Sequence, residues 1–269
     1  MSAAAHHGSD YHYAHHFDSL GQQQSTVRFG MWLFLVTEVL FFGGIMSAYT
    51  VYRTMYPDDF EAGSAALNPL AAILNSFLLL TSSLTITLGV RAAFDGDIAG
   101  LRKWLMATIL LGTAFLGLKA NEYYTDVKEG LVPTKAEDVI EVAKSVTVNG
   151  HDTIVYDKVR SSVFARKLEH VLKENEHEQL FEKCNPYRVQ LFFLFYYCMT
   201  GLHVLHMVIG LGLLVWQYIL AGNGFFNFKE RYVYVEAMSL YWHFVDMVWM
   251  FLLPLLYLAG PHSFDHLSL

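Results

Sequence analysis

The chain has 269 residues, of which 54% are hydrophobic, and a mean hydropathy of +0.31, a balance that excludes an ordinary soluble domain and predicts an integral membrane protein. The formal net charge is −7 at pH 7, so the chain lacks the positive field that attracts nucleic acid, whose phosphates bind through an excess of Lys and Arg. Two cysteines, Cys184 and Cys198, are too few for a disulfide framework.

The N-terminal tail, residues 1–28, is polar and rich in histidine. It lacks the basic start, the apolar centre and the small-residue cleavage site of a signal peptide, so we expect it to be retained. A solvated tail is the favoured interpretation, and proton buffering or metal binding by its histidines are the alternatives. These histidines are His6, His7, His12, His15 and His16.

Five apolar stretches follow, each long enough to cross about 30 Å of hydrocarbon as a helix. They are residues 29–51, 69–90, 104–124, 189–220 and 233–259. A chain in lipid must satisfy its own backbone hydrogen bonds, and these stretches are too long for barrel strands. The sequence therefore predicts an all-α bundle of five transmembrane helices. Asn68 before Pro69 predicts an N-cap with proline at the first helical position.

The short segments between the spans carry most of their basic residues on one side of the membrane. On that side are Arg28, Arg91, Arg102, Lys103, Lys229 and Arg231. The short segments on the other side hold Arg53. Because Lys and Arg are enriched in cytoplasmic loops, the N-terminus is predicted to be cytoplasmic and the C-terminal tail, residues 260–269, to lie outside.

A polar insertion, residues 125–188, separates the third and fourth spans and is predicted to form a small extramembrane domain on the outer side. Residues 144–159 alternate apolar and polar side chains around Asn149-Gly150, which predicts a β-hairpin. Residues 162–183 have helical spacing instead. The predicted organisation is a tail (1–28), three transmembrane helices (29–124), the insertion (125–188), two transmembrane helices (189–259) and a second tail (260–269).

Six ionisable side chains fall inside the apolar stretches, where each costs roughly 2.5–3.5 kcal/mol on insertion scales and needs a partner, a cavity or a function. They are Glu38, His203, His206, Glu236, His243 and Asp246. The spacing of Glu236, His243 and Asp246 predicts that they project from roughly one face of the fifth helix. His203 and His206 are predicted to share a face of the fourth helix.

Interhelical hydrogen bonds and lipid-headgroup contacts are the preferred interpretation of these six side chains. A metal site would resemble a di-iron bundle, but only HVLH and HFVD approach the required Glu-x-x-His spacing. A proton relay is the third interpretation. Lys119 and Glu122 are predicted to form an interfacial pair in which Lys119 reaches toward water. The hydroxyl-rich run at residues 81–87 predicts close helix packing.

Five segments carry distinctive motifs, each on a predicted helix. They are RFGMWLFLVTEVLFFGG around Glu38, LNSFLLLTSSLT from Leu74, FLGLKANEYY from Phe115, TGLHVLHMVIG from Thr200 and EAMSLYWHFVDMVW from Glu236. In this order, across residues 27–124 and 187–259, they resemble subunit III of the haem-copper oxidases, a family that covers cytochrome c oxidases and bacterial quinol oxidases. The pattern YWHFVDxVW is the most specific of the five.

The resemblance implies an accessory subunit III, not catalytic by itself, within a proton-pumping cytochrome c oxidase of aerobic respiration. Such a complex is a proton-translocating oxidoreductase that reduces oxygen to water at the end of an electron transport chain. Subunit III of a quinol oxidase and an accessory subunit of a nitric oxide reductase are the alternatives in the same superfamily. A stand-alone membrane metalloenzyme is the alternative of a different class.

The resemblance also implies that this chain binds no redox metal, that haem and copper lie in partner subunits, and that phospholipid is bound. The expected partners are oxidase subunit I, as the main contact, subunit II and other oxidase subunits, in a bacterial inner (plasma) membrane. The matching buried polar positions would serve helix packing, lipid-headgroup binding and proton uptake by subunit I. They are Glu38, His203, His206, Glu236, His243 and Asp246.

The chain departs from the family's pattern in three places. Mitochondrial-type members have seven spans, and this chain matches the last five, so a neighbouring subunit could supply the other two. The position of Lys119 usually holds Gln in the family. The insertion at residues 125–188 is much longer than the usual loop, and we expect it to be a docking surface for a partner, such as a respiratory supercomplex component.

Overall fold

The structure, a computed structural model, describes most of the chain. The described residues are 17, 19–129, 131, 140–148, 151–159, 163–174, 177–227 and 231–258. The histidines of the N-terminal tail, the turn Asn149-Gly150 and the C-terminal tail therefore lie outside the described residues. The expectations for these three segments stay predictions.

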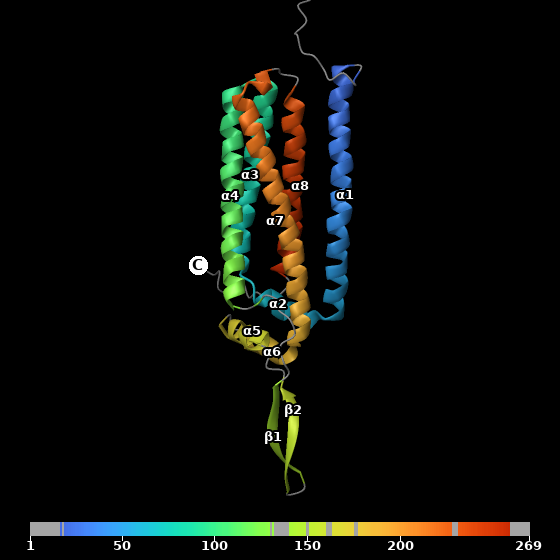
Figure 1. The fold of residues 1–269 in the computed structure, drawn as a ribbon, viewed down its shortest axis with the longest axis vertical. Helices are drawn as coiled ribbons and strands as arrows, with labels where there is room; N and C mark the ends of the chain where they lie inside the picture. Colours follow the sequence, from blue (N-terminus) through green and yellow to red (C-terminus); the bar gives the residue numbers. More distant parts are fainter. Residues whose placement is uncertain are drawn as a thin grey trace, which may run out of the picture. The chain divides into compact units, whose positions relative to one another are not determined.

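Within the described residues, five helices are long and apolar enough to cross a membrane, as predicted, and make this part of the chain an all-α membrane bundle (Figure 1). They are α1 (Leu20–Met55), α3 (Pro69–Asp95), α4 (Ile98–Glu129), α7 (Pro186–Gly222) and α8 (Tyr232–Leu256). Helix α1 begins nine residues before the predicted stretch, at Leu20 rather than at residue 29. Helix α8 ends at Leu256, two residues after Pro254, whereas the apolar stretch continues to residue 259.

The chain divides into two compact units, and each contains a segment of every one of the five long helices. Unit 1 is Met1–Phe41, Leu78–Thr113 and His206–Met247. Unit 2 is Phe42–Phe77, Ala114–Leu205 and Val248–Leu269. The short α-helices between α1 and α3 and between α4 and α7, and the β-hairpin, belong to unit 2.

The core of unit 1 is built around Trp242 of α8, whose side chain is fully buried. Its indole Nε1 donates a hydrogen bond to Ser82 Oγ on α3 at 3.0 Å, which satisfies the ring's one polar atom. Two glycines give the ring room. A Cβ on Gly112 of α4 would lie 2.8 Å from Trp242 Cη2, and a Cβ on Gly210 of α7 would lie 3.1 Å from Cζ3. Small residues thus let three helices approach one large ring, as is common in membrane bundles.

The core of unit 2 contains a second buried tryptophan, Trp249, which donates from Nε1 to Ser76 Oγ on α3 at 3.0 Å. Tyr49, near the end of α1, packs edge to face against Phe60, with ring centroids 5.3 Å apart. Phe60 belongs to α2 (Pro57–Ala65), and its ring contacts Phe192 of α7 with a centroid distance of 5.7 Å. Aromatic edge-to-face contacts therefore fix α2 against the long helices of this unit.

Local signals fix two of the helix starts. Asn68 Oδ1 accepts from the backbone N–H groups of Leu70 (3.1 Å) and Ala71 (3.2 Å), so the predicted N-cap of α3 is confirmed. Between α3 and α4, Gly96 adopts a φ of +80°, a conformation that costs glycine little. Asp97 then caps α4 by accepting from the backbone N–H of Gly100 at 2.9 Å.

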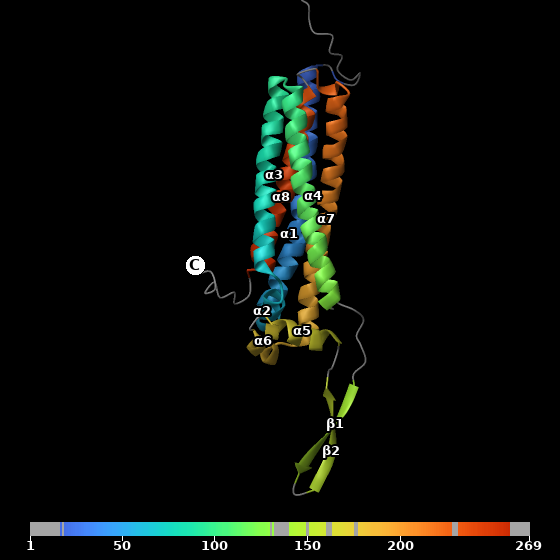
Figure 2. The same ribbon diagram turned by 90° about the vertical axis from the view of Figure 1, so that its left-hand side faces the viewer.

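The insertion contains the predicted hairpin and the predicted helical segment (Figure 2). Strands β1 (Ile140–Val148) and β2 (His151–Val159) pair antiparallel, with Val148 opposite His151, so the predicted pairing of two strands on either side of Asn149-Gly150 is confirmed, while the turn itself stays a prediction. Helices α5 (Val163–Glu174) and α6 (Glu178–Lys183) follow. Leu168 and Leu172 of α5 are fully buried, as their helical spacing predicted.

A short 3₁₀ helix, η1 (Phe225–Asn227), precedes α8.

Large apolar side chains are exposed along the long helices. Phe29, Leu33 and Leu40 of α1 are 70%, 57% and 71% exposed, and Trp216 of α7 is 63% exposed. In water such exposed apolar faces would favour aggregation, but in a membrane they face lipid tails or a neighbouring helix. The exposed faces therefore agree with a multi-pass membrane protein.

The segment between α6 and α7 holds a thiol with altered acidity. Burial raises the pKa of Cys184 to about 11, and the nearby carboxylate of Asp59 acts in the same direction. Because the folded pKa lies above the ordinary value of 9.0, the folded chain keeps this proton longer than the unfolded chain does. The thiol's contribution to stability is therefore lost as the pH rises from 9 to about 11.

We expect Cys184 to be alkylated slowly at neutral pH in a Cys198→Ser chain, with a rate that rises about tenfold per pH unit because the thiolate is the reactive form. The measurement is the pH dependence of iodoacetamide labelling, with the denatured chain as control. A rate that levels off near pH 9, as for an ordinary thiol, would contradict the assignment.

Candidate functional site

The first predicted group, Glu38 of α1, is paired with His206 of α7. His206 Nε2 lies 3.2 Å from Glu38 Oε2, and the two side chains are 13% and 19% exposed, respectively. The hydroxyl of Tyr241 on α8 donates to the backbone carbonyl of His206 at 2.9 Å. This arrangement joins three helices of unit 1 and gives a carboxylate inside an apolar stretch the partner that it requires.

A double-mutant cycle with Glu38→Gln and His206→Gln is expected to give a coupling energy of about 0.6–1.7 kcal/mol, the range of interhelical hydrogen bonds in membranes. The measurement is the free energy of unfolding in detergent for the four chains. The exposed pair Arg91–Asp95, whose charged atoms are 3.9 Å apart, is the control and should show no measurable coupling. Equal coupling in both cycles would mean that Glu38 and His206 do not interact as the structure indicates.

Glu236 of α8 pairs with Arg28 of α1. The Arg28 guanidinium donates to Glu236 Oε2 from Nη2 at 2.9 Å and from Nε at 3.1 Å, and it also donates to the Tyr232 hydroxyl at 2.8 Å. The two charged side chains are 40% and 32% exposed, respectively. Sequence reasoning treated Arg28 only as a topology signal and missed this pairing, although both residues lie near the starts of their helices.

His243 and Asp246 face α3 instead. Ser83 of α3 donates a hydrogen bond to Asp246 Oδ2, and His243 Nε2 lies 3.3 Å from Thr87 Oγ1. The other ring nitrogen of His243 lies 2.6 Å from the carbonyl of Ser239, one turn earlier. Glu236 lies two helical turns before His243 and is rotated from it by only about 20°, so the three side chains project from roughly one side of α8 but have partners on two helices, α1 for Glu236 and α3 for the other two.

The hydroxyl run at residues 81–87 packs α3 closely against its neighbours, as predicted. Besides the contacts of Ser82 with Trp242 and of Ser83 with Asp246, Thr85 Oγ1 lies 2.8 Å from Thr108 Oγ1 of α4. Each hydroxyl satisfies a polar group that lipid could not satisfy. The run thus forms a row of interhelical hydrogen bonds in unit 1.

His203 of α7 lies in an aromatic environment within unit 2. Its side chain is fully buried, stacks on Trp249 with ring centroids 5.3 Å apart, and meets the edge of Phe115 at 5.7 Å. His206, one turn further on, contacts Glu38 as described above. The structure therefore gives the two histidines different partners and does not bring them together at one site.

A polar cluster centred on Lys119 of α4 is the largest departure from the sequence-based prediction. Lys119 is 1% exposed, and its Nζ donates to both Glu122 carboxylate oxygens at 3.0 Å and to the Tyr257 hydroxyl at 2.5 Å. Nζ also lies 4.6 Å from the centre of the Trp249 ring. The Tyr196 hydroxyl donates to Glu122 Oε1 at 2.8 Å, and Asp126 Oδ2 lies 3.4 Å from the same hydroxyl.

The predicted pairing of Lys119 with Glu122 is confirmed, but the prediction that Lys119 reaches toward water is wrong. The ammonium group points inward to Glu122 and to the Tyr257 hydroxyl instead, and the side chain of Lys119 is 1% exposed. The Tyr257 hydroxyl accepts from Lys119 Nζ, and the rings of Tyr196 and Trp249 lie around it, with centroids 5.6 Å and 4.6 Å from Nζ. The hydroxyl partners of this pair, Tyr196 and Tyr257, are distant in sequence from Lys119, so no local signal predicted its burial.

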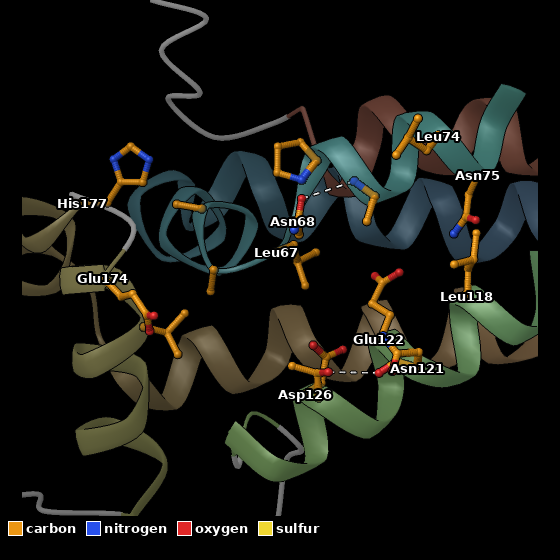
Figure 3. A pocket seen from close by; sticks show the side chains of 16 residues that line it. Leu67, Asn68, Leu74, Asn75, Leu118, Asn121, Glu122, Asp126, Glu174 and His177 are labelled. Carbon is orange, nitrogen blue, oxygen red and sulfur yellow. Dashed lines mark hydrogen bonds between the residues drawn. The ribbon is translucent and has the colours of Figure 1, made fainter. Parts of the chain in front are cut away.

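Beside this cluster lies a pocket of about 620 Å³ in unit 2 (Figure 3). Its walls come from the connection between α2 and α3, from the first turns of α3, from the last turns of α4 and from α5. The polar lining residues are Asn68, Asn75, Asn121, Glu122, Thr125, Asp126, Glu174 and His177. The apolar lining residues are Ala65, Ala66, Leu67, Pro69, Ala71, Leu74, Leu118 and Val171.

The predicted site residues therefore form separate pairs rather than one reaction centre. Among the residues that the structure describes, no three His, Cys, Asp or Glu side chains gather closely enough to hold a metal ion. What the observed pairs can do chemically is hold helices together, exchange a proton locally, and present charge to a headgroup or to a neighbouring subunit.

Comparison with known proteins gives consistent matches. The family model described as "Cytochrome c oxidase subunit III" matches residues 8–129 and 161–261. A relative named cytochrome c oxidase subunit 3 from Synechocystis sp. is 30% identical over 86% of this chain and 74% of its own length. Relatives of the same name from Thermostichus vulcanus and Oryctolagus cuniculus are each 28% identical, over 85% and 88% of this chain and 85% and 71% of their own lengths.

Proposed function

Because the chain belongs to the cytochrome c oxidase subunit III family, we propose that it docks on the haem-bearing subunit I and supports that subunit's stability and proton uptake. It is an accessory subunit of a haem-copper oxidase, within a complex that is a proton-translocating oxidoreductase. The relatives are named for cytochrome c oxidase, so the quinol oxidase and nitric oxide reductase alternatives are not favoured.

The observation that carries this proposal is the combination of a satisfied polar interior with exposed apolar helix faces. Four ionisable side chains of the apolar stretches each have a hydrogen-bond partner outside their own helix. They are Glu38, Lys119, Glu236 and Asp246. Helix α1 meanwhile exposes large side chains such as Phe29 and Leu40. In the proposal, the exposed apolar faces contact lipid or a neighbouring subunit, and the chain supports that neighbour. In the proposal it binds no redox metal, and haem and copper belong to partner subunits.

The six polar positions have roles in the proposal that follow from their contacts. Glu38, His206, His243 and Asp246 fix the packing of α1, α3, α7 and α8 beside the route by which subunit I takes up protons. The partly exposed Arg28–Glu236 pair would bind the phosphate of a phospholipid headgroup through the guanidinium. His203 packs α7 against α8, because its ring stacks on the ring of Trp249.

The proposed location is the inner membrane of a bacterium, with the N-terminus in the cytoplasm and the insertion outside. The support for this orientation is the distribution of Lys and Arg in the short connecting segments. Subunit II and further oxidase subunits are the other proposed contacts of the chain.

The supporting role is tested by purifying the oxidase from a strain that lacks only this chain. Subunit I should keep its haem, but its turnover should fall more steeply as the pH rises above neutral, because proton uptake becomes limiting, and its activity should decay faster during turnover. Reintroducing the chain should restore both properties. An unchanged pH profile and an unchanged catalytic lifetime would contradict the proposal.

The hairpin is proposed to dock a partner outside the oxidase core. Residues 130–160 lie between the two segments that the family model matches, so the family fold does not need them. Replacing residues 132–160 with a short Gly/Ser linker should leave the oxidase subunits together and release one additional protein. Native electrophoresis with mass spectrometry measures this, and a hairpin of scrambled sequence is the control. An unchanged set of partners would contradict the docking role.

A further inference from the structure

The pocket beside Lys119 has no part in the function proposed above, and the described part of the chain ends next to it. The last described residue is Leu258. The residue before it, Tyr257, donates from its hydroxyl to Glu122 Oε1 at 2.5 Å, and Glu122 lines the pocket. Tyr257, Glu122 and the whole lining belong to unit 2. The chain that follows Leu258 therefore starts close to the pocket wall, at a distance set by one tyrosine side chain.

The C-terminal tail, residues 260–269, is long enough to reach into this pocket. An extended chain covers at most about 3.3–3.6 Å per residue, so its ten residues span up to roughly 33–36 Å. The pocket has a volume of about 620 Å³, so only part of that length is needed. The tail begins with Gly260-Pro261, a dipeptide that favours a turn away from the direction of the preceding helix. Length and starting point therefore allow the tail to fold back over the pocket.

The lining of the pocket has an apolar part and a hydrogen-bonding part (Figure 3). Its larger aliphatic side chains are those of Leu74, Leu118 and Val171. Carboxylate, amide and hydroxyl oxygens come from Asn121, Thr125, Asp126 and Glu174. A pocket of this kind fits an occupant that combines apolar side chains with N–H donors.

The tail carries both kinds of group within a few residues. Phe264 and Leu267 are apolar, and His262 and His266 each carry an imidazole N–H. An imidazole has at least one N–H donor in either protonation state, so it can donate to a carboxylate whether it is neutral or positive. The sequence of the tail therefore complements the lining of the pocket.

The tether favours the tail over a ligand that diffuses freely. Binding of a linked segment is intramolecular, with an effective concentration that reaches the millimolar range for a short linker. A free molecule of the same chemistry also loses its translational and rotational freedom when it binds. Weak contacts in the pocket are therefore sufficient to hold the tail.

We propose that the C-terminal tail folds back into this pocket, with Phe264 against the aliphatic side chains and the two imidazoles toward Asp126 and Glu174. The docked tail connects the end of α8 to α4 and α5 and closes the pocket to lipid and water. The proposal concerns this chain alone, so its failure would leave the role of the chain in an oxidase untouched.

The test is disulfide cross-linking of the full chain in its native membrane, with Cys184 and Cys198 replaced by serine. Ser263→Cys in the tail is combined with Glu174→Cys, which lines the pocket, or with Arg166→Cys, an exposed position on the same helix outside the lining. A disulfide requires Cα atoms within about 7 Å, which a docked tail provides only for the first pair. The pair with Glu174→Cys should therefore link at least about tenfold faster.

The anchor is tested in the same background. Phe264→Ser, added to the pair of Ser263→Cys and Glu174→Cys, should slow linking to the rate of the pair with Arg166→Cys. Ser268→Ala is the control and should leave the rate unchanged. Equal rates for the two pairs, or a rate that Phe264→Ser does not change, would overturn the proposal.

A second measurement avoids any change inside the tail apart from its removal. Thr125→Cys, at an exposed position that lines the pocket, should react with a membrane-impermeant maleimide about tenfold faster when residues 260–269 are deleted. Val127→Cys, on the same helix outside the lining, is the control and should react at the same rate with and without the tail. Protection of Thr125→Cys that persists without the tail would assign the pocket to a lipid or to another subunit and would overturn the proposal.

Discussion

Replacing Lys119 with Met is expected to lower the free energy of unfolding by about 3–5 kcal/mol, the cost of removing one partner of a buried ion pair. Lys119 is 1% exposed and donates to both oxygens of Glu122. Without the ammonium group, the Glu122 carboxylate stays inside the protein with only tyrosine hydroxyls to compensate its charge. The cost of removing this carboxylate from water is then no longer offset by the ion pair, so the folded state is destabilised.

The double variant Lys119→Met with Glu122→Leu should recover most of this loss, because replacing a buried ion pair by apolar side chains is often nearly neutral. Unfolding by denaturing detergent measures both effects. Lys103→Met, at an exposed lysine on the same helix, is the control and should change stability little. If the single variant at Lys119 behaves like this control, the ammonium group is not buried as the structure indicates.

Trp242→Ala is the second change with a large expected effect, about 3–5 kcal/mol of destabilisation. The ring is fully buried and touches the space left by Gly112 and Gly210, so removing it opens a cavity where three helices meet. Trp242→Phe should cost less, because it keeps an aromatic ring and loses mainly the hydrogen bond to Ser82.

The control for this prediction is Trp216→Ala, since the side chain of Trp216 is 63% exposed. Unfolding in denaturing detergent again gives the comparison. Similar losses for Trp216→Ala and Trp242→Ala would mean that the tryptophans act through contacts with lipid or detergent rather than through helix packing.

The transmembrane helices could be predicted because the membrane leaves the chain few choices. An apolar stretch of about 20 residues must form a helix there. The cap at Asn68 and the hairpin around Asn149-Gly150 were equally predictable, since each depends on side chains close in sequence. The start of α1 at Leu20 was not, because polar residues such as Gln23 continue the helix beyond the hydrocarbon, where hydropathy no longer reports it.

The partners of the buried polar groups were much harder to predict. Spacing placed Glu236, His243 and Asp246 on roughly one face, but it could not show that Glu236 would contact Arg28 of α1 while the other two contact α3. The burial of Lys119 likewise depends on Tyr196 and Tyr257, which are distant in sequence. Such pairings follow from how each helix is rotated against its neighbours, and no local pattern in one sequence encodes that rotation.

Purification through an affinity tag on this chain, in mild detergent, is the most direct test of the central claim that it is an accessory subunit of a haem-copper oxidase. Optical spectra and mass spectrometry of the purified material should show haem together with a larger membrane subunit, and the preparation should reduce oxygen with electrons from cytochrome c. A colourless chain that purifies alone and carries its own stoichiometric metal would contradict the claim.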